Sequence, residues 1–445
     1  MTATRPSTRR ILTAPATKRA TQALTPGQAE VPLGPFAYGF ASIYITIAVL
    51  LAGPAYTFEP YVWTLTLAFP AGALLLAPRS QARRVVFDGP LMALVAWVAM
   101  SIMWTFNFEA GIFNVRRDVP LWIAASLMAT LLPKKDVIIA MKRGVILAIL
   151  ITIVGLIVDP STRISAAEGI FVADIPGWHG YFVHKNVFSP FLIFAVLLTV
   201  HFETEPVKRA IYLAVLAVLL VGSDSATGLS AAIFIGAVYI WFRFLFRSGV
   251  GRRSTAYVVS SIAVGLVALM GAAASLSVLT TAAGKDLTFS GRTFIWGAVL
   301  NAIRDRPFVG YGNGGVFWDQ QSDITRSIWS DVGFRIPHSH SGVLDVWLNY
   351  GAIGVILFGI VFITGVAKGL RLLRSSPSTA EWMLTLLAAQ FLMGLSENVF
   401  LGAWIVYIAL ARGIVQRELN DVARLDAEAN REQVLDAREV QPTNP

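Results

Sequence analysis

Residues 338–345 read His-Ser-His-Ser-Gly-Val-Leu-Asp and close a polar stretch that opens at residues 290–296 with Ser-Gly-Arg-Thr-Phe-Ile-Trp. The stretch passes through Pro307 and leads straight into an apolar run at 341–366. Elsewhere the chain consists mostly of apolar runs that approach or reach the roughly 20 residues a helix needs to cross a bilayer. The polar stretch is therefore the part of the chain where chemistry has room to occur.

The composition is that of an integral membrane protein. Of 445 residues, 55% are hydrophobic and only 14% are charged, whereas about 25% are charged in a typical soluble domain. The formal net charge is +9, but the basic residues lie between the apolar runs, which is typical of loops that set membrane topology. We therefore expect the lipid bilayer as a partner and no nucleic acid.

We predict an all-α polytopic membrane protein with about 12 transmembrane helices and a large loop before the last three. The apolar runs that predict these helices lie at 36–56, 60–78, 89–107, 119–133, 144–158, 186–202, 210–222, 226–246, 255–278, 341–366, 380–396 and 398–415. The chain then divides into a disordered basic tail (1–33), helices 1–9 (34–278), the large loop (279–340), helices 10–12 (341–415) and a charged tail (416–445). The tail at 416–445 has apolar residues at helical spacing, which predicts a surface helix ending before Pro442.

The distribution of lysine and arginine predicts the orientation in the membrane. If the N-terminus is cytoplasmic, 26 of the 36 basic residues lie on the cytoplasmic side and ten on the other. Every short loop on the first side is basic, so the positive-inside rule places both termini in the cytoplasm. The two long loops, about 159–185 and 279–340, then face the periplasm.

The loop at 279–340 contains a predicted helix of its own. Ser290 can cap it, apolar residues such as Ile295 and Val299 recur at helical spacing, and Pro307 prevents the helix from continuing. Arg292 lies in the first turn, where the helix dipole favours acidic side chains. A basic residue there is explained if it binds an anion; the alternative is an exposed arginine without such a role.

Ionisable side chains are almost absent from the apolar runs, with Asp345 as the clearest exception. This pattern disfavours a proton- or ion-coupled transporter, which needs buried acids or bases near the middle of the membrane. Four of the five histidines (His179, His184, His338 and His340) fall on the outer side. Any chemistry is therefore expected at the outer face.

His340 lies where the loop re-enters the membrane, and a neutral imidazole there suits deprotonation of a hydroxyl group. The alternative role, a helix cap, can be filled by Ser339 or Ser341. The histidines have no H-E-x-x-H spacing and no convincing acid partner, which predicts no metal. The pattern G-x-G-x-x-G at 310–315 lies in an outer loop, so it is interpreted as a flexible turn and not as a dinucleotide site.

Four stretches, in this order, resemble motifs of the O-antigen ligase and polymerase superfamily, and within it exopolysaccharide polymerases of the Wzy and ExoQ type. They are Gly-Tyr-Phe-Val-His-Lys-Asn at 180–186, Gly-Arg-Thr-Phe-Ile-Trp at 291–296, Arg-Pro-Phe-Val-Gly-Tyr-Gly at 306–312 and His-Ser-His-Ser-Gly-Val-Leu at 338–344. The resemblance implies a metal-independent, cofactor-free glycosyltransferase of the bacterial inner membrane. Such an enzyme polymerises undecaprenyl-pyrophosphate-linked oligosaccharide repeats at the periplasmic face, and a chain-length regulator or co-polymerase is a candidate partner.

The resemblance also implies roles for single residues. Arg292 would hold the donor pyrophosphate, and His340 would activate the acceptor hydroxyl. The residues with supporting roles would be His338, His184, Asp345 and Tyr311. Two activities remain as alternatives: a ligase that passes the glycan to a lipid A core or another acceptor, and a flippase or exporter of the same lipid-linked sugar.

The chain departs from the family pattern at two positions. Ser341 stands where asparagine often follows the motif histidine, and Ala226 stands where the segment Ser-x-Ser-(Arg/Lys)-Thr-Gly commonly has a basic residue. If the mechanism is shared, another cation must replace that basic residue. The candidates are Lys185, Arg116 and Arg117.

Overall fold

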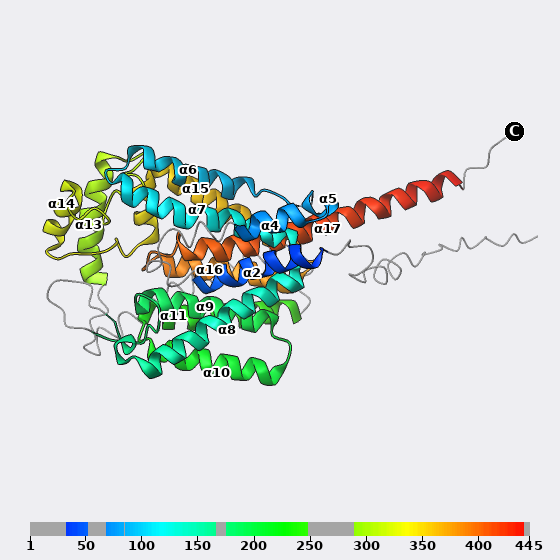
Figure 1. Cartoon of the computed structure of the whole chain (residues 1–445), viewed down its shortest axis with the longest axis horizontal. Coiled ribbons are helices and arrows are strands. Elements are labelled where there is room, and N and C mark those ends of the chain that lie inside the picture. Colours follow the sequence, from blue (N-terminus) through cyan, green and yellow to red (C-terminus); the bar gives the residue numbers. More distant parts are fainter. Residues whose placement is uncertain (1–32, 52–67, 84, 166–174, 248–288, 440–445) are drawn as a thin grey trace, which may run out of the picture.

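The computed structural model describes residues 33–51, 68–83, 85–165, 175–247 and 289–439. This part of the chain is almost entirely helical and forms an elongated bundle whose long helices run along its length (Figure 1). Among the residues that the structure describes, three helices are long and apolar enough to cross a membrane, α8 (Lys134–Val158), α9 (Lys185–Phe202) and α15 (Gly342–Leu372). The chain is thus a largely helical protein with a membrane location.

The other elements follow the predicted apolar runs and loops. Before α8 they are α2 (Pro35–Leu51), α4 (Ala68–Leu76), α5 (Arg79–Ala82), α6 (Gly89–Met100), η1 (Ser101–Trp104) and α7 (Phe108–Leu131). Between α8 and α15 they are η2 (Pro160–Arg163), β1 (Ile164–Ser165), β2 (Ile175–Pro176), α10 (Pro206–Gly222), α11 (Ala226–Arg247), α13 (Phe289–Asp305) and α14 (Asp323–Val332). After α15 come α16 (Pro377–Gly394) and α17 (Ala403–Glu439).

Most predicted runs coincide with helices, whereas the run at 255–278 and most of the tail at 1–33 lie outside the described residues. The predicted loop helix is confirmed as α13, but α14 was not predicted. The charged tail is helical, as predicted. It is not a separate surface helix, because α17 continues into it without a break.

Helix α8 begins ten residues before the apolar run at 144–158, and the predicted basic loop at 134–143 is therefore part of the helix. Ion pairs stabilise this extension. Lys134 Nζ lies 2.6 Å from Glu418 Oε1, and Lys142 Nζ lies 2.8 Å from Glu203 Oε2. Because each ammonium has a carboxylate partner, these charged residues continue a helix that hydropathy alone ends early.

Helix α7 likewise begins at Phe108, well before the apolar run at 119–133. The side chain of Asn107 caps it by accepting a hydrogen bond from the Ala110 N–H at 2.9 Å. Arg116 and Arg117, which were predicted in a loop, therefore lie within a helix.

A buried cation–carboxylate cluster joins three helices at one end of the bundle. Asp88, the N-cap of α6, accepts hydrogen bonds from Arg412 of α17 at 2.7 and 2.8 Å and from Lys368 of α15 at 2.8 Å. Burial raises the pKa of Asp88, but these bonds outweigh it and lower the pKa to about 2. The carboxylate therefore stays ionised and holds the three helices together.

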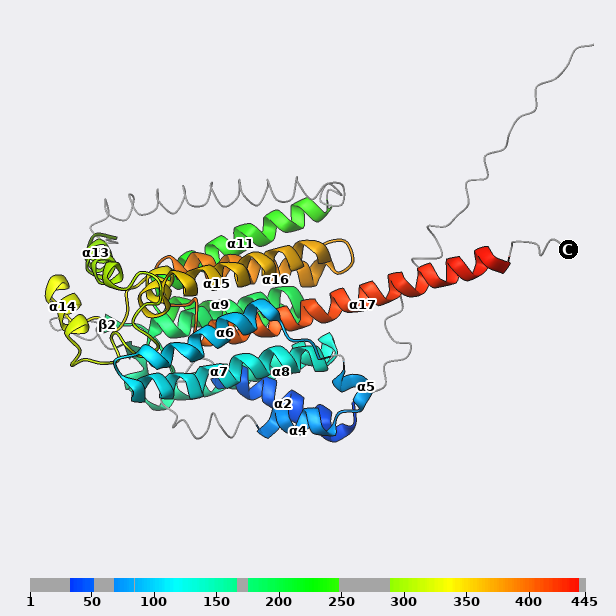
Figure 2. The same ribbon diagram turned by 90° about the horizontal axis from the view of Figure 1, so that it is seen from above.

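The opposite end of the bundle carries α13, α14 and β2 (Figure 2). The turn at 307–312 packs there against a break in α15 at Gly351, whose φ is +67° and ψ −174°. Pro307 O accepts from Ala352 N at 2.8 Å, and Leu348 O accepts from Tyr311 N at 2.9 Å. The glycine-rich segment is thus a turn, as predicted, but it is held by hydrogen bonds to an interrupted helix, which the sequence did not predict.

Candidate active site

Two residues singled out by the sequence, Arg292 and His340, lie beside a third that was not, Glu397. Arg292 lies in the first turn of α13, His340 just before α15, and Glu397 in the turn between α16 and α17. Arg292 Nη2 lies 3.3 Å from Glu397 Oε1, and His340 Nδ1 lies 3.8 Å from Glu397 Oε2. Glu397 is only 3% exposed, so its charge is balanced inside the protein by the guanidinium of Arg292.

The loop that carries His340 is held by hydrogen bonds within itself. The backbone of His340 is left-handed, with φ +53°, and its N–H donates to His338 Nδ1 at 3.1 Å. Asp345 Oδ1 accepts from the Ser339 N–H at 2.9 Å. Ser341, and not His340, is the N-cap of α15. His338 and Asp345 therefore position the loop, and the helix-cap alternative for His340 is wrong.

Lys185 lies beside the segment in which the family's basic residue is missing. Its Nζ donates to the backbone carbonyl of Asp224 at 3.3 Å, and it lies 3.8 Å from the Asp224 carboxylate. Three residues further along, Thr227 Oγ1 donates to Glu397 Oε1 at 3.4 Å. The segment 223–228 thus has Lys185 on one side and Glu397 on the other, which brings Lys185 to the same end of the bundle as the central cluster.

Arg116 and Arg117 have a different setting. Both lie in α7, where Arg116 is exposed and Arg117 is 4% exposed. Arg117 Nε donates to its neighbour Asp118 at 2.7 Å, so its charge already has a carboxylate partner. Of the three cations proposed to replace the missing basic residue, Lys185 has the most direct contact with the segment concerned.

The remaining supporting residues have structural contacts. His184 is the N-cap of α9, and its Nδ1 accepts from the Asn186 N–H at 3.1 Å. The hydroxyl of Tyr311 donates to Ala302 O at 2.9 Å and ties the glycine-rich turn to α13. Burial raises the pKa of Tyr311, and nearby Asp305 raises it further, so the phenol stays protonated and remains a donor.

Glu397 was missed, although the sequence contains a signal for it. It is the only acidic residue between Glu381 and Glu418, and it lies between the apolar runs at 380–396 and 398–415. A single carboxylate in a short segment between two apolar runs, on the predicted outer side, marks a functional candidate. The premise that the histidines have no acid partner is therefore wrong: ligand atoms of His338, His340 and Glu397 lie within 4.8 Å of one another.

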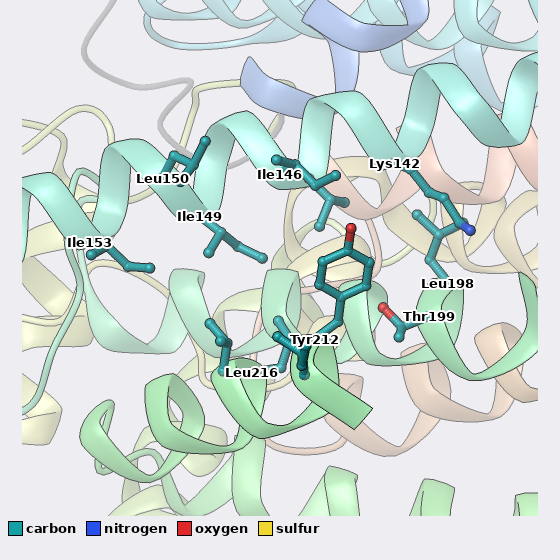
Figure 3. Close-up of a pocket in the computed structure, with 12 residues that line it drawn as sticks. Lys142, Ile146, Ile149, Leu150, Ile153, Leu198, Thr199, Tyr212 and Leu216 are labelled. Carbon is teal, nitrogen blue, oxygen red and sulfur yellow. The ribbon is translucent and has the colours of Figure 1, made fainter. Parts of the chain in front are cut away.

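A second feature, remote from this cluster, is a cavity of about 200 Å³ between α8, α9 and α10. Figure 3 shows apolar side chains such as Ile149 and Leu216 lining it, with Tyr212 near the middle and Lys142 at one end. Lys142 already pairs with Glu203. The cavity has almost no polar lining, so it offers few groups for acid–base chemistry.

Part of the chain is similar to known proteins. Residues 211–359 match the O-Antigen ligase family, and this segment contains Thr227, Arg292 and His340. The exopolysaccharide production protein ExoQ of Rhizobium meliloti (strain 1021) is 26% identical over 190 residues, which are 42% of this chain and 42% of ExoQ. The chain thus aligns with less than half of that relative's length. The predicted resemblance to the O-antigen ligase and polymerase superfamily is confirmed.

Proposed function

We propose that this protein is a glycosyltransferase of the bacterial inner membrane that polymerises lipid-linked oligosaccharide repeats at the periplasmic face. The observation that carries the proposal is the meeting of Arg292 and His340 on the buried carboxylate of Glu397. Arg292 and His340 lie in the segment that matches the family, and the similarity to an exopolysaccharide production protein favours the same chemistry.

His340 acts as the general base. The acceptor sugar hydroxyl attacks the anomeric carbon of the donor glycan, and its proton passes to the imidazole of His340. Because Glu397 Oε2 lies 3.8 Å from His340 Nδ1, its negative charge stabilises the imidazolium that forms. A positioned base of this kind contributes on the order of 10²–10⁴-fold to the rate.

Arg292 stabilises the leaving group. As the bond between the anomeric carbon and the pyrophosphate breaks, the electron pair stays on undecaprenyl pyrophosphate and negative charge develops there. The guanidinium of Arg292 is 29% exposed and can exchange part of its contact with Glu397 for phosphate oxygens. Lys185, beside Asp224, supplies a second positive charge. These steps need no metal ion.

A ligase is the second candidate, because the matching family is described as O-Antigen ligase. Both activities use the same donor and the same residues and differ only in the acceptor. A flippase is disfavoured by the clustering of polar residues at one end of the bundle. The proposed topology has about 12 transmembrane helices and both termini in the cytoplasm, and a chain-length regulator or co-polymerase is a proposed partner.

The test is polymerisation of lipid-linked repeats by the purified chain in nanodiscs, read as a ladder of product lengths. Wild type should produce the ladder equally well in excess EDTA. His340→Gln should fold and leave only single repeats, because glutamine cannot accept a proton at neutral pH. His338→Gln should be milder, since His338 acts through the loop backbone.

Three outcomes would contradict the proposal in different ways. A ladder made by His340→Gln but not by His338→Gln would move the base to the other histidine. Normal ladders from both variants would remove this cluster from the chemistry. Activity lost in EDTA and restored by Mg²⁺ or Mn²⁺ would make the enzyme metal-dependent.

A further inference from the structure

The cluster of His338, His340 and Glu397 has the donor set of a transition-metal site. One nitrogen of each imidazole and one carboxylate oxygen lie within 4.8 Å of one another. Two imidazoles and a carboxylate, with a fourth position left for water, are ligands that Zn²⁺ uses in proteins. We propose that these three residues bind a zinc-type divalent ion, and that binding switches the enzyme off.

The geometry needs only a modest closure. Zinc–ligand distances of about 2.0–2.2 Å place tetrahedral ligands about 3.4 Å apart. The atoms of His340 and Glu397 are already 3.8 Å apart, and the full set lies within 4.8 Å. His338 is half-buried, so the ion can approach from that side.

The charges of the surroundings are compatible with a cation. Arg292 opposes it, but its guanidinium contacts Oε1 of Glu397 at 3.3 Å and leaves Oε2 facing His340. A second acidic group, Asp345, interacts electrostatically with both histidines. Hard cations such as Mg²⁺ prefer oxygen ligands, so the two imidazoles select against Mg²⁺.

Occupancy of the site would stop the proposed reaction. A metal ion bound to His340 occupies the nitrogen lone pair that would accept the proton. Bound to Glu397, it neutralises the carboxylate charge that would stabilise the imidazolium. It also fixes the loop at 338–340 to the turn that holds Glu397. This inhibitory role rests on the proposed function, whereas the binding itself does not.

Binding is tested directly by isothermal titration of ZnCl₂ into the purified chain without a polyhistidine tag. Wild type should bind one ion per chain at micromolar ZnCl₂, with a rise in unfolding temperature, and MgCl₂ should give neither signal. His338→Gln and Glu397→Gln should each weaken zinc binding by more than about tenfold, the loss seen even for residues outside the ligand set. His179→Gln, a control histidine outside the cluster, should bind like wild type.

Inhibition is tested in the polymerisation assay. ZnCl₂ should abolish the ladder of wild type, and EDTA should restore it. In His338→Gln the zinc concentration for half inhibition should rise at least about tenfold. Each variant is compared with its own zinc-free rate. Zinc binding that is absent below millimolar concentrations, or unchanged in both cluster variants, would overturn the inference. Because calorimetry needs no turnover, that result leaves the proposed function standing. An inactive wild type that still binds zinc would instead count against the function.

Discussion

At the scale of single residues, Arg292 is the side chain best placed to meet an anion. Its guanidinium is partly exposed, while its partner Glu397 is buried. We expect Arg292→Lys to slow polymerisation at least about tenfold, or about 1.4 kcal/mol of transition-state stabilisation, because an ammonium cannot copy two parallel contacts to phosphate oxygens. The measurement is the initial rate at equal protein. Arg304→Lys, an exposed arginine on the same helix, is the control and should keep the wild-type rate. Equal rates for the two variants would show that Arg292 only pairs with Glu397.

Lys185 permits a rescue experiment. Its ammonium lies at the Asp224 carbonyl, two residues before the position where the family pattern has a basic residue and this chain has Ala226. We expect Lys185→Met to lower the polymerisation rate at least about tenfold, a loss of about 1.4 kcal/mol, because a positive charge near the pyrophosphate is lost. Adding Ala226→Arg should recover part of the rate, since residue 226 is exposed and can carry the charge.

Arg116→Met is the comparison variant and should be close to wild type. If it abolished activity while Lys185→Met did not, the replacement cation would lie on α7.

The residues of the site were only partly predictable. Motif order was sufficient to propose His340 and Arg292, because each stands in a short local pattern. Glu397 belongs to no such pattern, and its role depends on a turn that meets α13 and the loop before α15 from far along the chain. Hydropathy placed Arg117 in a loop and could not show its pairing with Asp118.

At the scale of elements, the break in α15 gives a sharp prediction. A Cβ added to Gly351 would lie 2.0 Å from Phe308 O, at a φ of +67° that side chains rarely adopt. Gly351→Ala should therefore lower the free energy of unfolding by at least about 1–3 kcal/mol, the usual cost of such backbone strain. Thermal unfolding in detergent is the measurement.

Gly359→Ala in the same helix is the matched control, because its Cβ would meet nothing within 4 Å. It should be neutral or slightly stabilising, since alanine favours helix over glycine. Equal unfolding temperatures for both variants would mean that the turn at 307–312 does not depend on the break.

The helices were predictable where apolar residues continue without interruption, and their ends were not. Helix α8 extends through charged residues because Glu203 and Glu418 neutralise Lys142 and Lys134. Such pairing is tertiary and cannot be seen in a hydropathy profile. Helix α14 was missed because it is short and amphipathic, so hydropathy does not mark it. Its apolar side packs in a cluster with residues of α13.

At the scale of the whole molecule, the predicted orientation can be tested because the chain has no cysteine of its own. Single cysteines at Ser330 of α14 and Ala423 of α17 would both be exposed and would lie at opposite ends of the bundle. With the outer membrane permeabilised, a membrane-impermeant maleimide should label Ser330→Cys at once and Ala423→Cys only after lysis. The reverse pattern would invert the topology, and labelling of both before lysis would refute a spanning bundle.

Helix α17 has a mechanical consequence. It packs against α7 inside the bundle and then runs on alone, with exposed side chains at residues 423–433 (Figure 1). At 1.5 Å per residue, its end at Glu439 stands about 27 Å beyond Asp421. If α17 tilts by about 10° within the bundle, its C-terminal end moves by about 5 Å. Because α17 starts just after the turn that carries Glu397, a fluorophore at the tip would convert small rearrangements of that turn into displacements large enough to follow by energy transfer.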